Sequence, residues 1–145
     1  MGKLDMYHDS RISVLDLKEG LLPCLPESKF DSDSVTKASQ LNQDELKQLL
    51  PYLLSWIQDL NWPIAMEVLP LLISAEKEVI PEIEWVLKGK DEIWKGNCIR
   101  CVLMSLSSEV VQPLVPHLQR IAEDPTKNEL AEETDIDAKE CIAHL

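Results

Sequence analysis

Two short stretches carry side chains of the type and spacing that bind zinc. Cys98 and Cys101 are three residues apart, and Cys141 and His144 repeat that spacing. Three thiolates and one imidazole form a common tetrahedral zinc set. A second interpretation competes, because cysteines three residues apart in a regular helix usually lie in the core as small apolar groups. We favour the core, so we predict no metal and no cofactor, although the sequence does not show whether the four side chains meet in space.

The acidic run Glu-Glu-Thr-Asp-Ile-Asp, residues 132–137, is the other stretch with the chemistry of a cation site. It lacks the glycine and the distal glutamate of a calcium-binding loop, so we expect a solvated acidic surface. His8 lies in a polar N-terminal stretch, and His117 follows Pro116 in an expected helix. Neither a Gly-x-Ser-x-Gly nor a His-Glu-x-x-His motif is present. The sequence nominates no catalytic residue, and we predict that the protein is not an enzyme.

The composition is that of an acidic chain that folds. Of 145 residues, 45 % are hydrophobic, and 26 acidic against 14 basic residues give a net charge of −12. This charge repels phosphate backbones, so we do not expect a nucleic-acid partner. No apolar run reaches the ~18 residues of a membrane span, and we expect no membrane association. The N-terminal sequence lacks a signal-peptide core, which predicts a cytoplasmic protein with reduced thiols.

The elements that position these side chains are expected to be helices. Asn42 followed by Glu45 is a capping-box start, and leucines then recur at helical spacing as far as residue 60. Pro51 lies inside this helix and should kink it. After the helix ends, Asn61 is expected to cap the next one, with Trp62 in its first turn.

The N-terminal part is less regular. Residues 1–20 are polar, and we expect a mobile arm, followed by one helical domain over residues 21–145. Residues 21–26 are apolar but contain two prolines, which predicts an extended segment. Ser32 or Asp33 is a suitable N-cap for a short helix.

A sequence pattern repeats at an interval of thirty residues. Residues 49–73 align with residues 79–103, so that Pro51 matches Pro81. The other aligned pairs are Leu53 with Ile83, Ile57 with Leu87, Asn61 with Asp91, Val68 with Cys98, Leu69 with Ile99, and Leu72 with Val102.

A third copy begins at residues 114–125, with Pro116 in the corresponding place and its second helix delayed to about residue 135. Helix pairs of this length cannot bury their apolar faces singly, so they stack. We therefore predict an all-α fold: a short right-handed α-solenoid of about three helical hairpins with an N-terminal capping helix.

The pattern Leu-Leu-Pro-x-Leu, followed by Asp59 and a second helix, resembles a HEAT repeat. That family carries a proline in the first helix, an aspartate near its end and a basic residue early in the second helix. Pro51 and Asp59 match the pattern in the first copy, and Lys95 matches it in the second. Ala65 and Gly89 depart from it, at the basic position of the first copy and the aspartate position of the second. The resemblance implies a pair between Asp59 and Lys95.

From about Leu22 onwards the chain also resembles a small, mostly bacterial family of domains of unknown function, numbered 5071. The motifs that carry this resemblance are Leu-Pro-x-x-Lys-Phe-Asp, then Trp-Ile-Gln-Asp-Leu-Asn-Trp-Pro-Ile-Ala, and later Asp-x-Ile-Trp-Lys at 91–95. The family is similar to HEAT-like helical folds and has no assigned activity. The resemblance therefore implies a fold and leaves the function open.

The corner around Asn61 and Trp62 has a structural and a functional interpretation. In the first, Asn61 caps a helix and Trp62 fills a gap between neighbouring hairpins. In the second, Trp62 and Trp94 lie along one edge of the solenoid and form a strip that binds a partner, as interface tryptophans often do. The candidate binding residues are Asp59, Asn61, Trp62, Trp94 and Lys95.

Function is predicted only as a class. Our first hypothesis is a non-enzymatic protein–protein interaction module, because residues 121–145 hold eight acidic and two basic residues and favour a basic protein partner. A narrower version is an immunity protein that neutralises a basic toxin. The alternative is a zinc-binding or enzymatic helical domain that uses the cysteines and His144. Neither the partner's identity nor the oligomeric state follows from the sequence.

Overall fold

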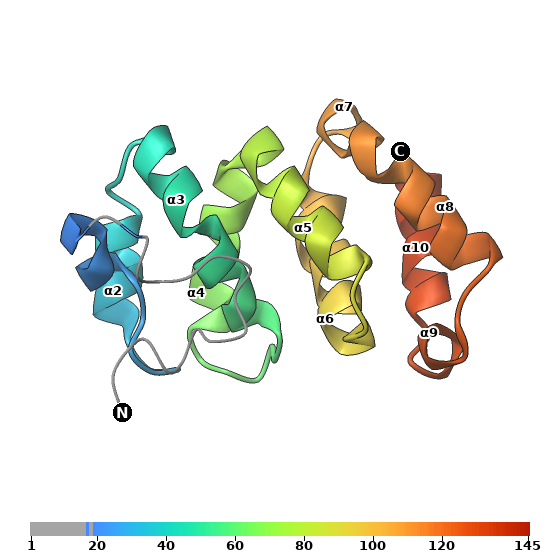
Figure 1. The fold of residues 1–145 in the computed structure, drawn as a ribbon, viewed down its shortest axis with the longest axis horizontal. Coiled ribbons are helices and arrows are strands. Elements are labelled where there is room, and N and C mark those ends of the chain that lie inside the picture. The colour runs from blue at the N-terminus through green and yellow to red at the C-terminus, as the bar shows by residue number, and fades with distance from the viewer. Residues whose placement is uncertain (1–16, 18) are drawn as a thin grey trace. The chain divides into compact units, whose positions relative to one another are not determined.

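The computed structural model describes residues 17 and 19–145, and every regular element within them is helical (Figure 1). The predicted all-α class is confirmed. The chain divides into two compact units, Met1–Ala75 and Glu76–Leu145, called here the N-terminal and C-terminal units. The single domain over residues 21–145 and the solenoid stay predictions. The expected mobile arm, residues 1–20, lies outside the described residues except at positions 17, 19 and 20.

The N-terminal unit is built around α3. The capping box predicted for its start is confirmed, because Asn42 Oδ1 accepts from the Glu45 N–H at 2.9 Å and Glu45 Oε1 accepts from the Asn42 N–H at 3.2 Å. Pro51 lies in the helix interior, as predicted. The elements are η2 (Glu19–Cys24), α2 (Ser32–Ala38), α3 (Gln43–Leu54), η3 (Ser55–Ile57) and α4 (Ala65–Ser74).

The leucines of α3 form the core of this unit. The predicted stripe is buried at Leu46, Leu49, Leu50, Leu53, Leu54 and Ile57. The helices α2 and α3 both contact α4. Two local predictions were wrong. Asp31, one residue before Ser32, caps α2 by accepting from the Ser34 N–H at 3.2 Å. Residues 21–24 belong to the 3₁₀ turn η2 and are not extended, and Leu25, which follows this turn, is fully buried.

The corner before α4 also differs from the prediction. Asn61 does not cap this helix, which begins at Ala65 after Ile64 without a side-chain cap. The Asn61 N–H donates to Asp59 Oδ1 at 2.9 Å, and the Trp62 N–H donates to the Asp59 carbonyl at 3.2 Å. Because Asp59 holds both N–H groups, the chain turns there and the helix starts later.

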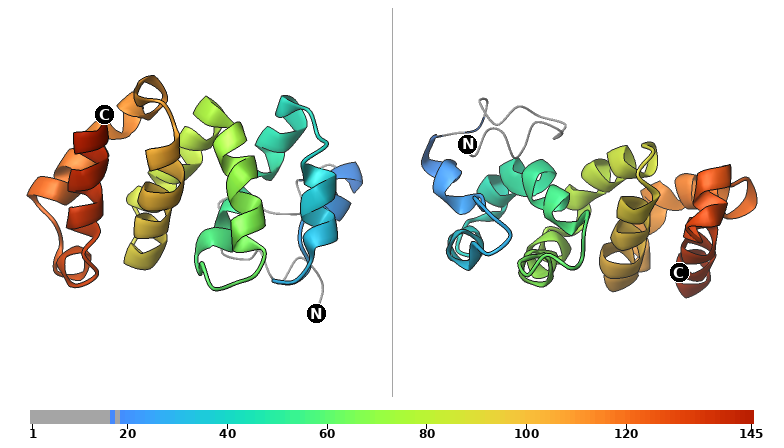
Figure 2. Two further views of the ribbon diagram at one scale, coloured as in Figure 1. Left: turned by 180° about the vertical axis from the view of Figure 1, so that it is seen from behind. Right: turned by 90° about the horizontal axis from the view of Figure 1, so that it is seen from below.

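In the C-terminal unit α8 packs against α10, and the two helices lie side by side in both views of Figure 2. The last helix begins at Thr134, close to the predicted residue 135. The elements are η4 (Glu76–Val79), α5 (Ile80–Leu87), α6 (Glu92–Asn97), the π turn η5 (Cys98–Val102), η6 (Leu103–Ser105), α7 (Ser108–Val111), η7 (Gln112–Leu114), α8 (Val115–Glu123), α9 (Lys127–Ala131) and α10 (Thr134–His144). None of the helices in the described residues is long and apolar enough to cross a lipid bilayer.

The thirty-residue repeat is visible in the pattern of burial. All of the apolar pairs aligned above are buried in both copies. The capping positions and the prolines follow it less well. Asp91 caps α6 by accepting from the Trp94 N–H at 3.0 Å, whereas the aligned Asn61 does not cap α4. Pro81 and Pro116 lie in equivalent places at the starts of α5 and α8, but Pro51 differs because it lies inside α3.

Candidate functional site

Each unit contains a pair of tryptophans in edge-to-face contact. In the N-terminal unit the Trp56 and Trp62 ring centroids are 5.4 Å apart, and in the C-terminal unit those of Trp85 and Trp94 are 5.9 Å apart. Trp56 and Trp94 are buried, Trp62 is half-buried, and Trp85 is 40 % exposed. The exposed ring of the C-terminal pair is thus Trp85, which the sequence did not nominate.

The other predicted binding residues have different surroundings. Asp59 is half-buried and Asn61 is exposed, whereas Lys95 is only 2 % exposed. Their burial gives Trp94 and Lys95 structural roles that the sequence did not reveal. A pair between Asp59 and Lys95 would link the two units and stays a prediction, as does a binding role for Asp59, Asn61 and Trp62.

Lys95 belongs to a buried ionic cluster centred on Glu129, whose side chain is fully buried. The Lys95 ammonium lies 3.0 Å from Glu129 Oε2 and 3.3 Å from Glu92 Oε1. The Arg120 guanidinium donates to both oxygens of Glu129, at 2.6 and 2.8 Å. The Thr126 N–H donates to Oε1 at 2.8 Å. We call Lys95, Arg120 and Glu129 the ionic hub.

The electrostatics of the ionic hub favour the charged carboxylate. Burial by itself raises the pKa of Glu129, but the hydrogen bonds from Arg120, the Thr126 N–H and Lys95 lower it to about 2. Thr126 and Glu129 also form a capping box at the start of α9. The hub therefore joins α9 to α6 and α8, and its role is to hold these helices together.

A second polar cluster surrounds Arg100, just after α6. Its guanidinium pairs with Asp137 on α10 and donates to Asn97 Oδ1 at 3.0 Å. Burial raises the pKa of Asp137, and Arg100 offsets only part of that effect. Gly96 leaves room for this contact, because a Cβ at that position would lie 2.7 Å from Arg100 Nη1.

The proposed zinc ligands do not form a metal site. Cys98 and Cys141 are fully buried, which confirms that they lie in the core, while Cys101 is half-buried and His144 is exposed. Burial raises the pKa of all three thiols, as is usual for cysteines in an apolar environment. Within residues 17 and 19–145, no three His, Cys, Asp or Glu side chains are grouped so as to hold a metal ion.

The acidic run 132–137 is only partly the solvated surface that we expected, because Glu132 and Glu133 are exposed and Asp137 is half-buried. Thr134 is fully buried and Asp135 is 8 % exposed. Glu133 adopts a left-handed conformation, with φ of 58°, and α10 starts directly after it. This sharp entry turns the first residues of α10 inward, and Lys139 pairs with Asp135 at 3.6 Å.

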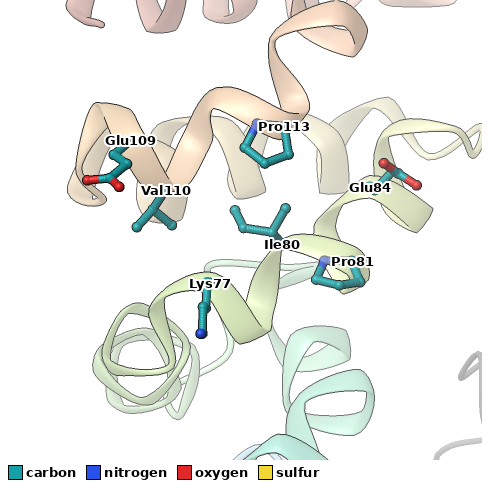
Figure 3. A pocket seen from close by; sticks show the side chains of 7 residues that line it. All are labelled: Lys77, Ile80, Pro81, Glu84, Glu109, Val110 and Pro113. Carbon is teal, nitrogen blue, oxygen red and sulfur yellow. The ribbon is translucent and has the colours of Figure 1, made fainter.

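An open groove of about 510 Å³ lies on the C-terminal unit, between α5 and the α7–η7 segment. In Figure 3, Glu109 and Glu84 lie toward opposite ends of this groove, with Ile80 and Pro113 between them. It is lined by Lys77, Ile80, Pro81, Glu84, Glu109, Val110 and Pro113. Such a groove can hold an apolar side chain next to a charged one.

The two carboxylates of the groove differ in their environment. Glu84 lies 3.4 Å from Lys88 Nζ and 3.3 Å from His117 Nε2. Burial by itself raises the pKa of Glu84, but Lys88 and His117 together lower it below its ordinary value. Glu109 and Lys77 are exposed, and neither has an ion pair within the described part of the chain. Glu109 is therefore the carboxylate that is free to meet a ligand.

The sequence of residues 24–142 matches a family model described as "Domain of unknown function (DUF5071)". The match runs from Cys24 in η2 to Ile142 in α10, and so includes the groove and the ionic hub. No curated protein matches the chain.

Proposed function

Because the chain belongs to this family of domains of unknown function, whose description assigns no activity, we propose a function from its own side chains. The protein is a non-enzymatic interaction module that binds a basic protein partner. The observation that carries this proposal is the arrangement of charge in the C-terminal unit.

Most of the basic side chains of the C-terminal unit form ion pairs within that unit. Residues 76–145 contain fifteen acidic and eight basic residues, and at least five of the basic side chains pair with carboxylates of the same unit. A surplus of carboxylates remains at the surface, and its field attracts a cationic protein. The five are Lys88 with Glu84, Lys95 with Glu92 and Glu129, Arg100 with Asp137, Arg120 with Glu129, and Lys139 with Asp135.

Exposed apolar side chains accompany this charge. Trp85 and Ile93 are 40 % and 55 % exposed, and Leu130 and Ile136 are similarly open. Apolar anchors surrounded by polar residues are typical of protein interfaces. They favour a protein partner over a small cation.

The finer parts of the proposal follow from the sequence. Stacked HEAT-like hairpins in a right-handed solenoid present an extended surface to a partner. Asp59, Asn61 and Trp62 are candidate contacts in the N-terminal unit. The free cysteines fit a reducing compartment, and we place the protein in the cytoplasm. A narrower form, favoured by the small size and the charge of −12, is an immunity protein against a basic toxin.

The test is affinity purification from the native host at low and at high salt, with an unrelated protein of equal length and charge as control. We expect a basic protein that is recovered at low salt, reduced at high salt and absent from the control. Titration calorimetry with the purified pair then checks a stoichiometric complex. Recovery of the same proteins by the control, or of none at either salt concentration, would refute the proposal.

A further inference from the structure

Part of the wall of the groove on the C-terminal unit has a restricted backbone. Two prolines, Pro81 and Pro113, lie in its wall at the starts of α5 and η7. Their rings fix the backbone φ angles, so this part of the wall loses little conformational entropy on binding. Both are exposed, Val110 is half-buried and Ile80 is buried, which gives an apolar floor open to solvent. The volume, about 510 Å³, suits a few side chains.

The charged residues around the apolar floor of the groove determine which charge a ligand should carry. At one end Glu84 already faces Lys88 and His117. The unpaired charges of the lining are Glu109 and Lys77, which act in opposite directions on an incoming ion. Since acidic residues exceed basic ones by seven in the C-terminal unit, the wider field favours a cation.

We propose that this groove is the docking site for a short basic segment of a protein partner. An apolar side chain of the segment lies on Ile80, Val110 and Pro113, and a neighbouring Lys or Arg lies against Glu109. The inference rests on the proposed function, and it adds the place of binding and the chemistry of the bound segment.

The probe is a phage-displayed library of random linear peptides, selected on the full-length protein. We expect the enriched peptides to combine an apolar residue with Lys or Arg. In fluorescence anisotropy with the best peptide, Glu109→Lys should raise Kd roughly five- to tenfold and Lys77→Glu should lower it a few-fold, because these exposed charges act on the same cation with opposite signs. Glu123→Lys is the matched control, since this exposed residue on α8 does not line the groove, and it should change Kd less than about twofold.

Three outcomes of experiments with the purified proteins would overturn the inference. The first is a reversal of the two signs, which would mean an acidic ligand. The second is equal weakening by Glu109→Lys and Glu123→Lys, which would mean attraction by net charge alone. The third is a concentration-dependent dimer in analytical ultracentrifugation that Val110→Asp abolishes, which would mean that a second copy occupies the groove.

Affinity purification from the native host with the groove variants distinguishes failure of this inference from failure of the proposed function. If Glu109→Lys and Val110→Asp proteins recover the same basic partner as wild type, the interaction function stands and the groove is not its site. If no partner is recovered by any of the proteins, the proposed function itself fails. Circular dichroism of each variant checks that the helices are retained.

Discussion

In the N-terminal unit the side chains removed from water are almost all apolar, with Ser34 the buried polar residue among those described. In the C-terminal unit the core also contains Lys95, Asn97, Glu129, Thr134 and Asp135. Leucine packing tolerates small adjustments, because each contact is weak and non-directional. An ion pair in the interior requires fixed geometry, since an unpaired charge there is costly. The two units should therefore respond differently to substitution and to pH.

The largest expected effect tests the ionic hub directly. Glu129→Ala leaves the buried Lys95 ammonium without its main partner, and the free energy of unfolding should fall by about 3–5 kcal/mol. Urea denaturation followed by circular dichroism measures this change. Glu132→Ala, at an exposed carboxylate, is the control and should cost less than about 0.5 kcal/mol. A loss below about 1 kcal/mol for Glu129→Ala would remove the contrast between the units.

Acid should weaken the C-terminal unit through the same carboxylate. The pKa of Glu129 is lowered from 4.5 to about 2 in the folded chain, so its contribution is complete above about pH 4.5 and is lost as the pH falls toward 2. The loss is at most about 3 kcal/mol. The measurement is the urea midpoint from about pH 6 to about pH 2 for wild type and for Glu129→Gln. We expect the Gln variant to lose much of the pH dependence, and identical curves would contradict the hub's role.

The tryptophan pair of the N-terminal unit should show the graded response of an apolar core. Trp56→Ala removes a buried ring and should cost about 3–5 kcal/mol, whereas Trp62→Ala removes a half-buried one and should cost about 2 kcal/mol. A double-mutant cycle in thermal denaturation should give a coupling of about 0.5–1.5 kcal/mol for the edge-to-face contact. If Trp62→Ala is neutral, the ring is free, and the predicted binding strip gains support.

The smallest effect concerns Gly96, beside the Arg100–Asp137 pair. The Cβ of Gly96→Ala would displace the Arg100 guanidinium, but alanine favours the helix by about 1 kcal/mol, so the net change should be within about 1 kcal/mol. In an Arg100→Ala background the same substitution should stabilise the protein by up to about 1 kcal/mol. Thermal denaturation of the four proteins measures both effects. A loss in both backgrounds would show that Asp137 Oδ2, which would lie 3.0 Å from the added Cβ, excludes a side chain even without Arg100.

The local features of the fold were the easiest to predict from sequence. The Asn42–Glu45 box and the late final helix depend on neighbouring residues, and the structure has both. The Thr126–Glu129 capping box was an equally local signal that we did not use, and with it α9 was missed.

The candidate site was harder to predict, because it depends on contacts between distant residues. Lys95 and Glu129 are 34 positions apart, and no spacing rule links them. Spacing also does not show which ring of an aromatic pair faces solvent, so Trp94 was nominated in place of Trp85. The π turn at Cys98–Val102 has no sequence signal, and within it Cys101 is half-buried where the aligned Leu71 is buried. The groove combines η4, α5, α7 and η7, and became apparent only from their packing.

The burial of Cys98 and Cys141 has a practical consequence for anyone handling the protein. An oxidant or an alkylating reagent can reach these sulfur atoms only after the helices around them have opened. A covalent dimer joined through either residue, or a mass increment on it, therefore marks a molecule in which the surrounding helices once opened. The share of marked chains in a stored sample reports how often that opening has happened.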